Sequence, residues 1–232
     1  MVVLHYTGMK TGAEALSRMC DPAAKVSAHY MIEEDGRIYR LVPEERRAWH
    51  AGISFWKGET DINGASIGIE IVNPGHEFGY RDFPPAQIDA VIGLLDGIRE
   101  RWEIPDHRIL AHSDIAPARK ADPGERFPWQ TLADHGHGLW VAPDMPPEGA
   151  MGPPLGSGET GLGVFSLQSA LGKLGYNILA GGPYDVETAT IVTAFQRHWV
   201  PEQIGTDLEG RADARLRVRL MALLRHITLM EV

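Results

Sequence analysis

The sequence predicts an α/β fold, in which helices flank a mixed central β-sheet, followed by a small C-terminal domain of three helices. Three observations predict it. In residues 1–142, short runs rich in β-branched residues alternate with a long segment of helical periodicity. Residues 143–161 are rich in proline and glycine and have no hydrophobic period, which is typical of a linker. Residues 162–232 then contain three helical segments.

The strands of the first domain follow from short apolar runs bounded by turn residues. The dipeptide Asp35-Gly36 between two such runs is a strong hairpin signal. We expect a further short strand before His112. The longer predicted strands are Val2–Tyr6, His29–Glu33, Arg37–Val42 and Ile67–Val72.

Helices are predicted from their apolar faces. Residues 9–22 look helical and hold the single cysteine, Cys20, so an internal disulfide is excluded. Residues 85–102 place Ile88, Val91, Leu95 and Ile98 on one face, which predicts an amphipathic helix. The three C-terminal helices are expected in residues 162–176, 185–199 and 211–227. Because a linker precedes them, we expect the two domains to have separate hydrophobic clusters.

Composition excludes some functions. The 31 acidic residues outnumber the 22 basic ones, the net charge is −9, and the basic residues form no continuous stripe, so no nucleic-acid partner is expected. No run is long and apolar enough to span a membrane. The chain begins directly with a strand-like segment and shows no signal peptide, which predicts a cytoplasmic protein. A leader removed ahead of Met1 would instead predict a periplasmic or outer-membrane-associated one. The oligomeric state is left open.

The candidate site lies in the segment AHSDIAPARKADPGERFPW, residues 111–129. It places His112, Lys120 and Asp122 on a loop whose prolines and glycine restrict the backbone. Imidazole and carboxylate are good zinc ligands. A charged surface loop is the alternative interpretation of this segment alone.

Two further candidate functional residues lie on predicted strands. His5 stands near the carboxyl end of the first strand, where ligands collect in open α/β sheets. Glu70 alternates with Ile69 and Ile71 and so falls on the opposite face of its strand. A carboxylate in such a run is costly to bury unless it is paired, hydrogen-bonded or used in chemistry.

These segments resemble one family. HYTG, SAHYMIEEDGRIYRLVPEERRAWHAG, INGASIGIEIVNPG and the 111–129 segment, in this order, are similar to the zinc-dependent N-acetylmuramoyl-L-alanine amidases of the AmpD and AmiD type. The resemblance covers roughly the first three-fifths of the chain. It implies one zinc ion per chain held by His5, His112 and Asp122, with Glu70 and Lys120 as catalytic residues. It also implies that the substrate is peptidoglycan or a muropeptide.

The chemistry of such a site can also be argued from the residue types, without the resemblance. Zinc with three protein ligands keeps a position open for catalysis and makes water more acidic. Glu70 would act as general base and then general acid, and Lys120 would stabilise the oxyanion. Candidate substrate-binding residues, for which structural roles are an alternative, are His29, His50, Trp49, Asn63 and Arg119.

Two alternatives to the amidase stay open: a catalytically silent peptidoglycan-binding protein, and a zinc hydrolase acting on another amide. The C-terminal pattern LQ-x2-L-x2-LGY, followed by GG-x-YD-x2-T-x5-AFQ, resembles the three-helix peptidoglycan-binding module of wall hydrolases. A helical cap that shields the catalytic domain is the alternative for this region.

Overall fold

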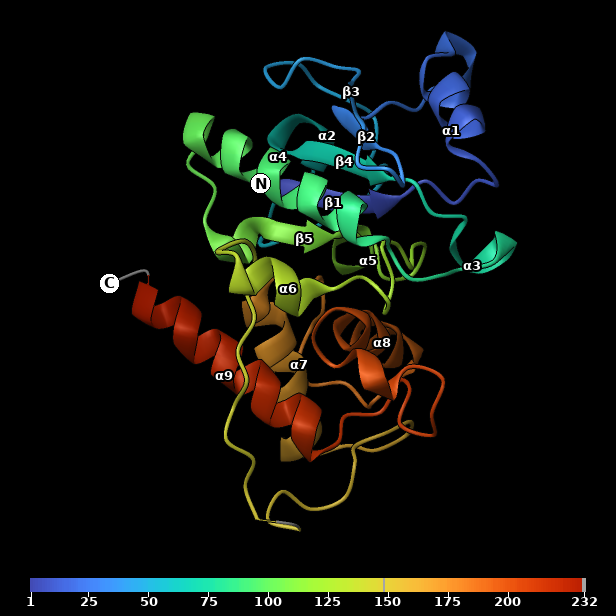
Figure 1. The fold of residues 1–232 in the computed structure, drawn as a ribbon. Coiled ribbons are helices and arrows are strands. Elements are labelled where there is room, and N and C mark those ends of the chain that lie inside the picture. The colour runs from blue at the N-terminus through green and yellow to red at the C-terminus, as the bar shows by residue number, and fades with distance from the viewer. Residues whose placement is uncertain (148, 231–232) are drawn as a thin grey trace.

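The structure is a computed structural model that describes residues 1–147 and 149–230. Its centre is a five-stranded sheet with the order β3-β2-β4-β1-β5 (Figure 1). Every neighbouring pair is parallel except β2 with β3, which form the hairpin predicted at Asp35-Gly36. The predicted mixed sheet is therefore confirmed. The strands are β1 (Val2–Tyr6), β2 (Tyr30–Ile32), β3 (Ile38–Arg40), β4 (Ile67–Ile71) and β5 (Ile109–Ala111).

The two faces of the sheet are buried by different parts of the chain. Helix α4 (Pro85–Arg101) covers one face, where Val91 and Leu95 pack against Leu4 and Ile69 (Figure 1). Side chains alternate along a strand, so Val3, next to Leu4, points to the opposite face. The shorter helices around the sheet are α1 (Gly12–Met19), α2 (Ile62–Ala65), α3 (Gly75–Phe78), α5 (His112–Ile115) and α6 (Trp129–Asp134).

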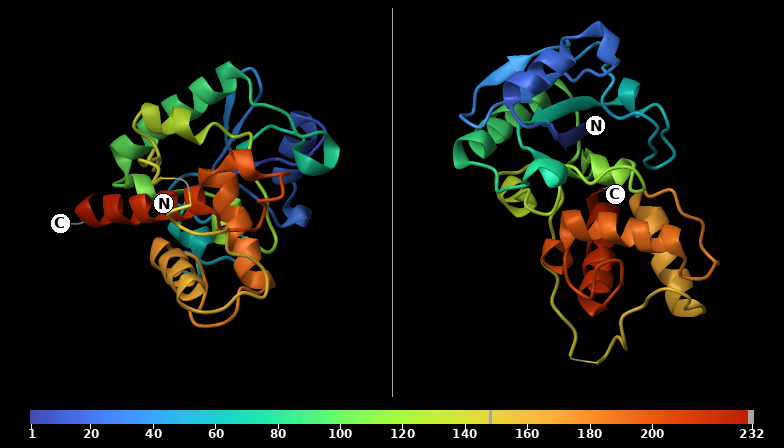
Figure 2. Two further views of the ribbon diagram at one scale, coloured as in Figure 1. Left: turned by 90° about the horizontal axis from the view of Figure 1, so that it is seen from below. Right: turned by 90° about the vertical axis from the view of Figure 1, so that its right-hand side faces the viewer.

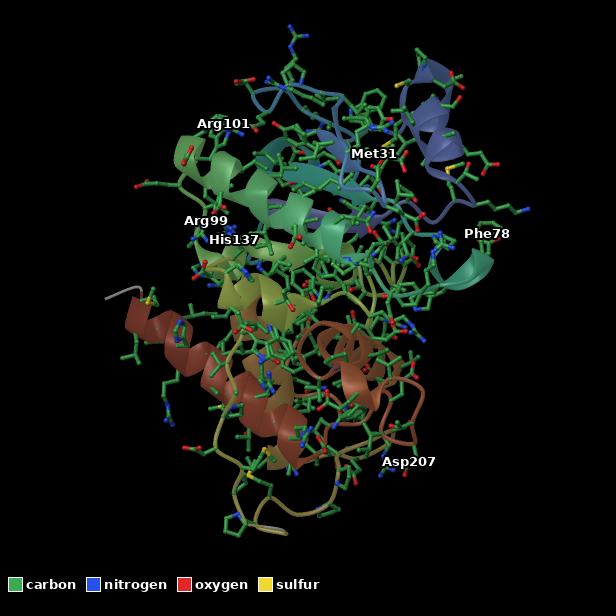
Figure 3. All side chains as sticks on the ribbon, viewed as in Figure 1. Met31, Phe78, Arg99, Arg101, His137 and Asp207 are labelled. Atoms are coloured by element: carbon green, nitrogen blue, oxygen red, sulfur yellow. The ribbon has the colours of Figure 1, made fainter. Side chains whose placement is uncertain are left out.

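The C-terminal end of α4 is fixed by the carboxylate of Glu44. Arg101, labelled in Figure 3, donates two hydrogen bonds to it, of 3.0 and 2.6 Å. The indole of Trp102 and the hydroxyl of Tyr30 donate to the same carboxylate. Hydrogen bonding from Arg101 holds the pKa of Glu44 at about 2, although burial acts in the opposite direction. The carboxylate of Glu44 therefore links the end of α4 to β2.

Three helices follow the proline-rich segment, as predicted: α7 (Leu162–Leu174), α8 (Val186–Trp199) and α9 (Ala214–Met230). Asp185 caps α8 by accepting a hydrogen bond from the amide of Thr188. The helices lie on the β5 side of the sheet (Figure 1), and the connecting segment loops away from the body (Figure 2). None of the helices in the described ranges is both long and apolar enough to cross a membrane.

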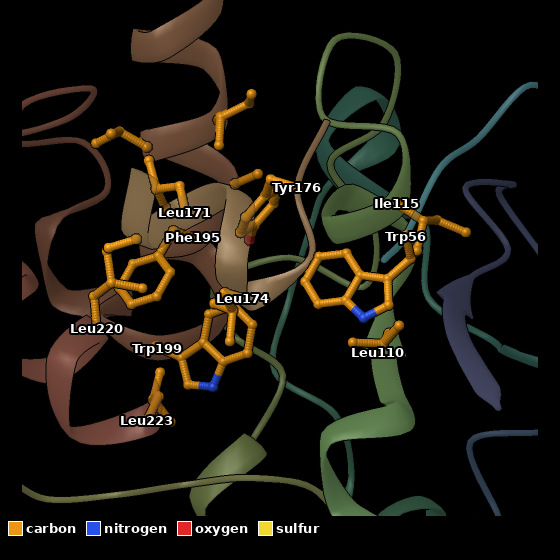
Figure 4. Packing of buried hydrophobic residues seen from close by; sticks show 14 of the residues in the cluster. Trp56, Leu110, Ile115, Leu171, Leu174, Tyr176, Phe195, Trp199, Leu220 and Leu223 are labelled. Atoms are coloured by element: carbon orange, nitrogen blue, oxygen red, sulfur yellow. The ribbon is translucent and has the colours of Figure 1, made fainter. Parts of the chain in front are cut away.

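The expectation of separate hydrophobic clusters is wrong. One buried cluster joins Val3 and Leu110 of the sheet to residues of all three C-terminal helices (Figure 4). The physical reason is that α4 buries only one face of the sheet. On the other face, α1 packs on Met31 of β2, and the C-terminal helices bury the part that carries Val3 and Leu110. Domain boundaries at residues 142 and 161 stay a prediction. Other large side chains of this cluster are Trp56, Ile115, Leu171, Leu174, Tyr176, Phe195, Trp199, Leu220 and Leu223.

Candidate metal centre and active site

Three side chains from distant parts of the sequence converge at the carboxyl edge of the sheet. His5 lies on β1, His112 begins α5 directly after β5, and Asp122 lies on the loop that follows. The Nδ1 atoms of the two histidines are 2.8 Å apart, and Asp122 Oδ2 is 3.1 and 2.9 Å from them. These are the three residues that the sequence predicted as metal ligands. Because β1 and β5 are parallel neighbours, their carboxyl ends lie side by side, and the two histidines are close together there.

The donor set suits a small divalent cation. On a tetrahedral ion with zinc-ligand distances of about 2.0–2.1 Å, ligand atoms lie roughly 3.3 Å apart. Burial, with the proximity of His112, lowers the pKa of His5 to about 4, so this imidazole is neutral at neutral pH. Burial alone would raise the pKa of Asp122, but interactions with His112 and His5 outweigh it and keep the carboxyl ionised. Neutral imidazole and ionised carboxylate are the forms that bind metal.

Hydrogen bonds at the far side of each imidazole fix its orientation. His112 Nε2 donates to the carbonyl oxygen of Ala51 at 3.1 Å, which leaves its Nδ1 as an acceptor for the metal. His5 Nε2 lies 3.0 Å from Nδ1 of His50, whose own Nε2 is 3.4 Å from the hydroxyl of Ser66. His50 is 5% exposed. It supports His5 through this contact and also lines the cavity.

Glu70 lies directly beside the predicted metal ligands. It is the strand partner of His5 in the register of β4 with β1. Its Oε2 is buried and has no hydrogen-bond partner among the described residues. Burial raises the pKa of Glu70 to about 8, Asp122 acts in the same direction, and Lys120 opposes the rise. A carboxylate with a raised pKa and a buried oxygen that no donor holds is suited to exchanging protons.

A cavity of about 610 Å³ opens over these groups and contains both Glu70 and Lys120 in its wall. Tyr6 and His76 also line this cavity. The hydroxyl of Tyr6 is 3.0 Å from His76 Nδ1, and His76 Nε2 lies 3.1 Å from a carboxylate oxygen of Glu125. The sequence does not predict this cluster, because its members are 49 and 70 residues apart and belong to no local pattern.

The predicted substrate-binding residues fall in different places. Arg119 lines the cavity and donates to the carbonyl oxygens of Ala51 and Ile53, at 2.8 and 2.7 Å. Trp49 is 53% exposed and lies beside Met19 in a neighbouring depression, outside the cavity wall.

Two of the predicted substrate-binding residues contact the backbone around the site, and a role of either in substrate binding stays a prediction. His29 is fully buried, and its ring nitrogens are engaged by the carbonyl of Arg46 and the amide of Gly68. Asn63 uses its side-chain oxygen to accept the backbone amides of His50 and Ala51. Both residues hold the backbone around the site. The histidine in SAHY matches the family pattern, but sequence alone did not show whether its ring faces the core or the cavity.

A carboxylate and a lysine in a cavity beside a cluster of three candidate metal ligands are the groups expected in a metal-dependent hydrolase. Comparison with known proteins gives the family. The profile of the family described as N-acetylmuramoyl-L-alanine amidase (Amidase_2) matches residues 1–125. The chain belongs to this family.

Several relatives match almost the whole chain. The N-acetylmuramoyl-L-alanine amidase AmiD of Escherichia coli is 36% identical over 236 residues, which cover 97% of this chain and 82% of that protein. A structure of that enzyme with the substrate anhydro-N-acetylmuramic acid-L-Ala-D-gamma-Glu-L-Lys has a TM-score of 0.80 and covers 97% of this chain and 88% of its own.

Two other relatives differ in the share of the chain that they match. AmpDh3 of Pseudomonas aeruginosa is 30% identical, with a TM-score of 0.79, and covers 98% of this chain and 92% of its own. The 1,6-anhydro-N-acetylmuramyl-L-alanine amidase AmpD of Citrobacter freundii is 38% identical over 105 residues, which cover 45% of this chain and 54% of that protein. The arrangement of sheet and C-terminal helices therefore matches AmiD and AmpDh3.

Proposed function

We propose that this protein is a zinc-dependent amidase that hydrolyses the bond between N-acetylmuramic acid and L-alanine in peptidoglycan or muropeptides. The observation that carries the proposal is the convergence of His5, His112 and Asp122 within about 3 Å of one another, beside Glu70 and Lys120. Solved structures of relatives support the substrate class, since AmiD is seen with a muropeptide substrate and AmpDh3 with anhydromuramic pentapeptide.

Each residue of the site has a separate role in the proposed reaction. Zinc held by the two imidazoles and the carboxylate supplies Lewis acidity toward the scissile carbonyl and toward water. Glu70 removes a proton from the attacking water and later gives it to the leaving amine of L-alanine. Lys120 places its positive charge at the oxygen that becomes negative when the carbonyl carbon turns tetrahedral. The carbon-nitrogen bond breaks, water supplies the hydroxyl of the new carboxylic acid, and Glu70 regains its ionised form.

Two alternatives are less well supported. A silent peptidoglycan-binding protein does not need a glutamate at position 70 whose buried Oε2 has no hydrogen-bond partner among the described residues, beside a metal site. A zinc hydrolase of another amide could use the same chemistry, but the near full-length similarity to muramoyl amidases favours the muramoyl-alanine bond.

Removal of one ligand tests the metal site. His112→Ala should lose most of its zinc and its activity on a soluble anhydro-muropeptide, because two remaining ligands hold the ion weakly. Elemental analysis of purified protein gives the zinc content per chain. His226→Ala, which removes an exposed histidine from α9, is the control and should keep one zinc ion. Full zinc occupancy in His112→Ala would remove this residue from the ligand set.

Removal of the cavity lysine separates metal binding from chemistry. Lys120→Met should keep its zinc and lower kcat by about 10²–10³-fold, as expected for loss of a group that stabilises an oxyanion. Steady-state kinetics on the soluble muropeptide provide the measurement, and Lys173→Met on the exposed side of α7 is the control. Near-normal turnover of Lys120→Met would show that the assigned role is wrong.

A further inference from the structure

The amidase reaction proposed above does not use Asp114, a carboxylate in the third position of α5, two residues after His112. Its side chain is fully buried, with 1% of the residue exposed. An ionised carboxylate in such a place is strongly destabilising unless hydrogen-bond donors surround it. Three donors do so, and two of them come from the C-terminal part of the chain.

The donors divide between the two oxygens of Asp114. Oδ2 accepts the backbone amide of Ala111 at 2.8 Å and Nδ1 of His198 at 2.7 Å. Oδ1 accepts the hydroxyl of Tyr176 at 2.9 Å. Because an ionised carboxylate only accepts hydrogen bonds, His198 must carry its hydrogen on Nδ1.

The two C-terminal donors are themselves held by aromatic contacts with the catalytic part. The ring of His198 stacks on Trp129 of α6, with centroids 3.7 Å apart and planes inclined by 22°. The ring of Tyr176 meets Trp56 edge to face at 5.0 Å, and both are labelled in Figure 4. The network therefore crosses the shared core and has little freedom to move.

The network stabilises the turn at which the chain leaves β5 and enters α5. Asp114 accepts the backbone amide of Ala111 across this turn, and His112 lies between these two residues. The amide of Ser113 donates in turn to the carbonyl oxygen of Asp122 at 3.0 Å. A displacement of α5 would therefore move two of the three predicted metal ligands.

We infer that Asp114, Tyr176 and His198 form a positioning network through which the C-terminal helices hold His112 and Asp122 in the geometry for metal binding. The inference depends on the proposed zinc amidase, since it concerns the ligands of that site. It makes the C-terminal helices part of the catalytic scaffold, in addition to any contact that they make with the wall.

Paired substitutions of buried tyrosines test the inference. Tyr176→Phe removes only the hydroxyl that binds Asp114. Tyr184→Phe is the matched control, because Tyr184 is also fully buried and donates one hydrogen bond, at 2.7 Å, to the carbonyl of Gly210 within the C-terminal part. His198→Phe keeps a stacking ring but loses the donor, whereas His198→Asn offers an amide hydrogen near the former Nδ1.

The main readout is the zinc dissociation constant, measured by competition with a chromogenic chelator, beside the melting temperature of the zinc-free protein. Supporting partners of metal ligands typically contribute 10–100-fold in metal affinity. We expect Tyr176→Phe and His198→Phe to raise the zinc dissociation constant about tenfold, and His198→Asn to recover part of this loss. Tyr184→Phe should lower the melting temperature to a similar extent and leave zinc affinity unchanged.

The outcomes separate the inference from the proposed function. Zinc affinities within twofold of the wild type in Tyr176→Phe and His198→Phe would overturn the positioning role. An equal loss of affinity in Tyr184→Phe would also overturn it, because general destabilisation would then explain the effect. A wild-type protein that binds no zinc would instead refute the proposed function itself.

Discussion

Glu70→Gln should still bind zinc and muropeptide but turn over about 10²–10⁴-fold more slowly, the usual range for loss of a general acid-base residue. The amide has nearly the same shape as the carboxylate but cannot accept the proton of the attacking water. Glu70 suits this role because its Oε2 is buried, has no hydrogen-bond partner among the described residues, and lies beside His5. The effect should appear in kcat, while KM and zinc content change little.

The pH profile gives a second readout of the same variant. A general base works only when ionised, so wild-type kcat should fall as the pH drops through the pKa of Glu70. Burial raises this pKa, and a cation at the neighbouring ligands would lower it. In Glu70→Gln the acid-side fall should disappear. Glu100→Gln, on the exposed surface of α4, is the control, and near-normal kcat in Glu70→Gln would contradict the proposed role.

A chain ending at Asp144 should fail to fold into a stable, zinc-binding form. Truncation would uncover Trp56, Leu110 and Ile115, which the C-terminal helices bury. Each large side chain contributes roughly 1.5–3 kcal/mol when buried. A total stability of about 5–15 kcal/mol does not tolerate the loss of several such contributions. Asp114 would in addition lose two of its three donors.

Circular dichroism, zinc content and activity on soluble muropeptide and insoluble peptidoglycan measure this outcome. We expect both activities to be lost together. A chain cut within residues 149–152, with both fragments retained, is the control, because its shared core stays intact and it should remain folded. A truncated chain that keeps its zinc and loses activity only on insoluble peptidoglycan would contradict the shared-core account and favour a wall anchor acting through effective concentration.

The sequence predicted the sheet because the relevant information is local. Alternation of Ile67, Ile69 and Ile71 predicts a strand, and Asp35-Gly36 predicts the hairpin, independently of the rest of the chain. The three candidate metal ligands could also be predicted from the sequence, since two lie in one distinctive segment and His5 stands near a strand end. The structure brings all three together at one point.

The docking of the C-terminal helices could not be predicted in the same way. An apolar Val3 indicates that its face of the sheet is buried, but not which segment covers it. A proline-rich segment before three helices is compatible with both a free module and a docked one. The contact between Asp114 and His198 joins residues 84 positions apart, and only the folded chain reveals it.

The most direct test of the account is the identity of the bond that the protein cleaves. Purified wild-type protein with zinc is incubated with a muropeptide in water enriched in the heavy oxygen isotope, and the fragments are analysed by mass spectrometry. The account predicts a free peptide that begins with L-alanine and a muramic acid fragment carrying one heavy oxygen in its new carboxylate. Cleavage only at another amide bond, or binding of the muropeptide without any cleavage, would contradict it.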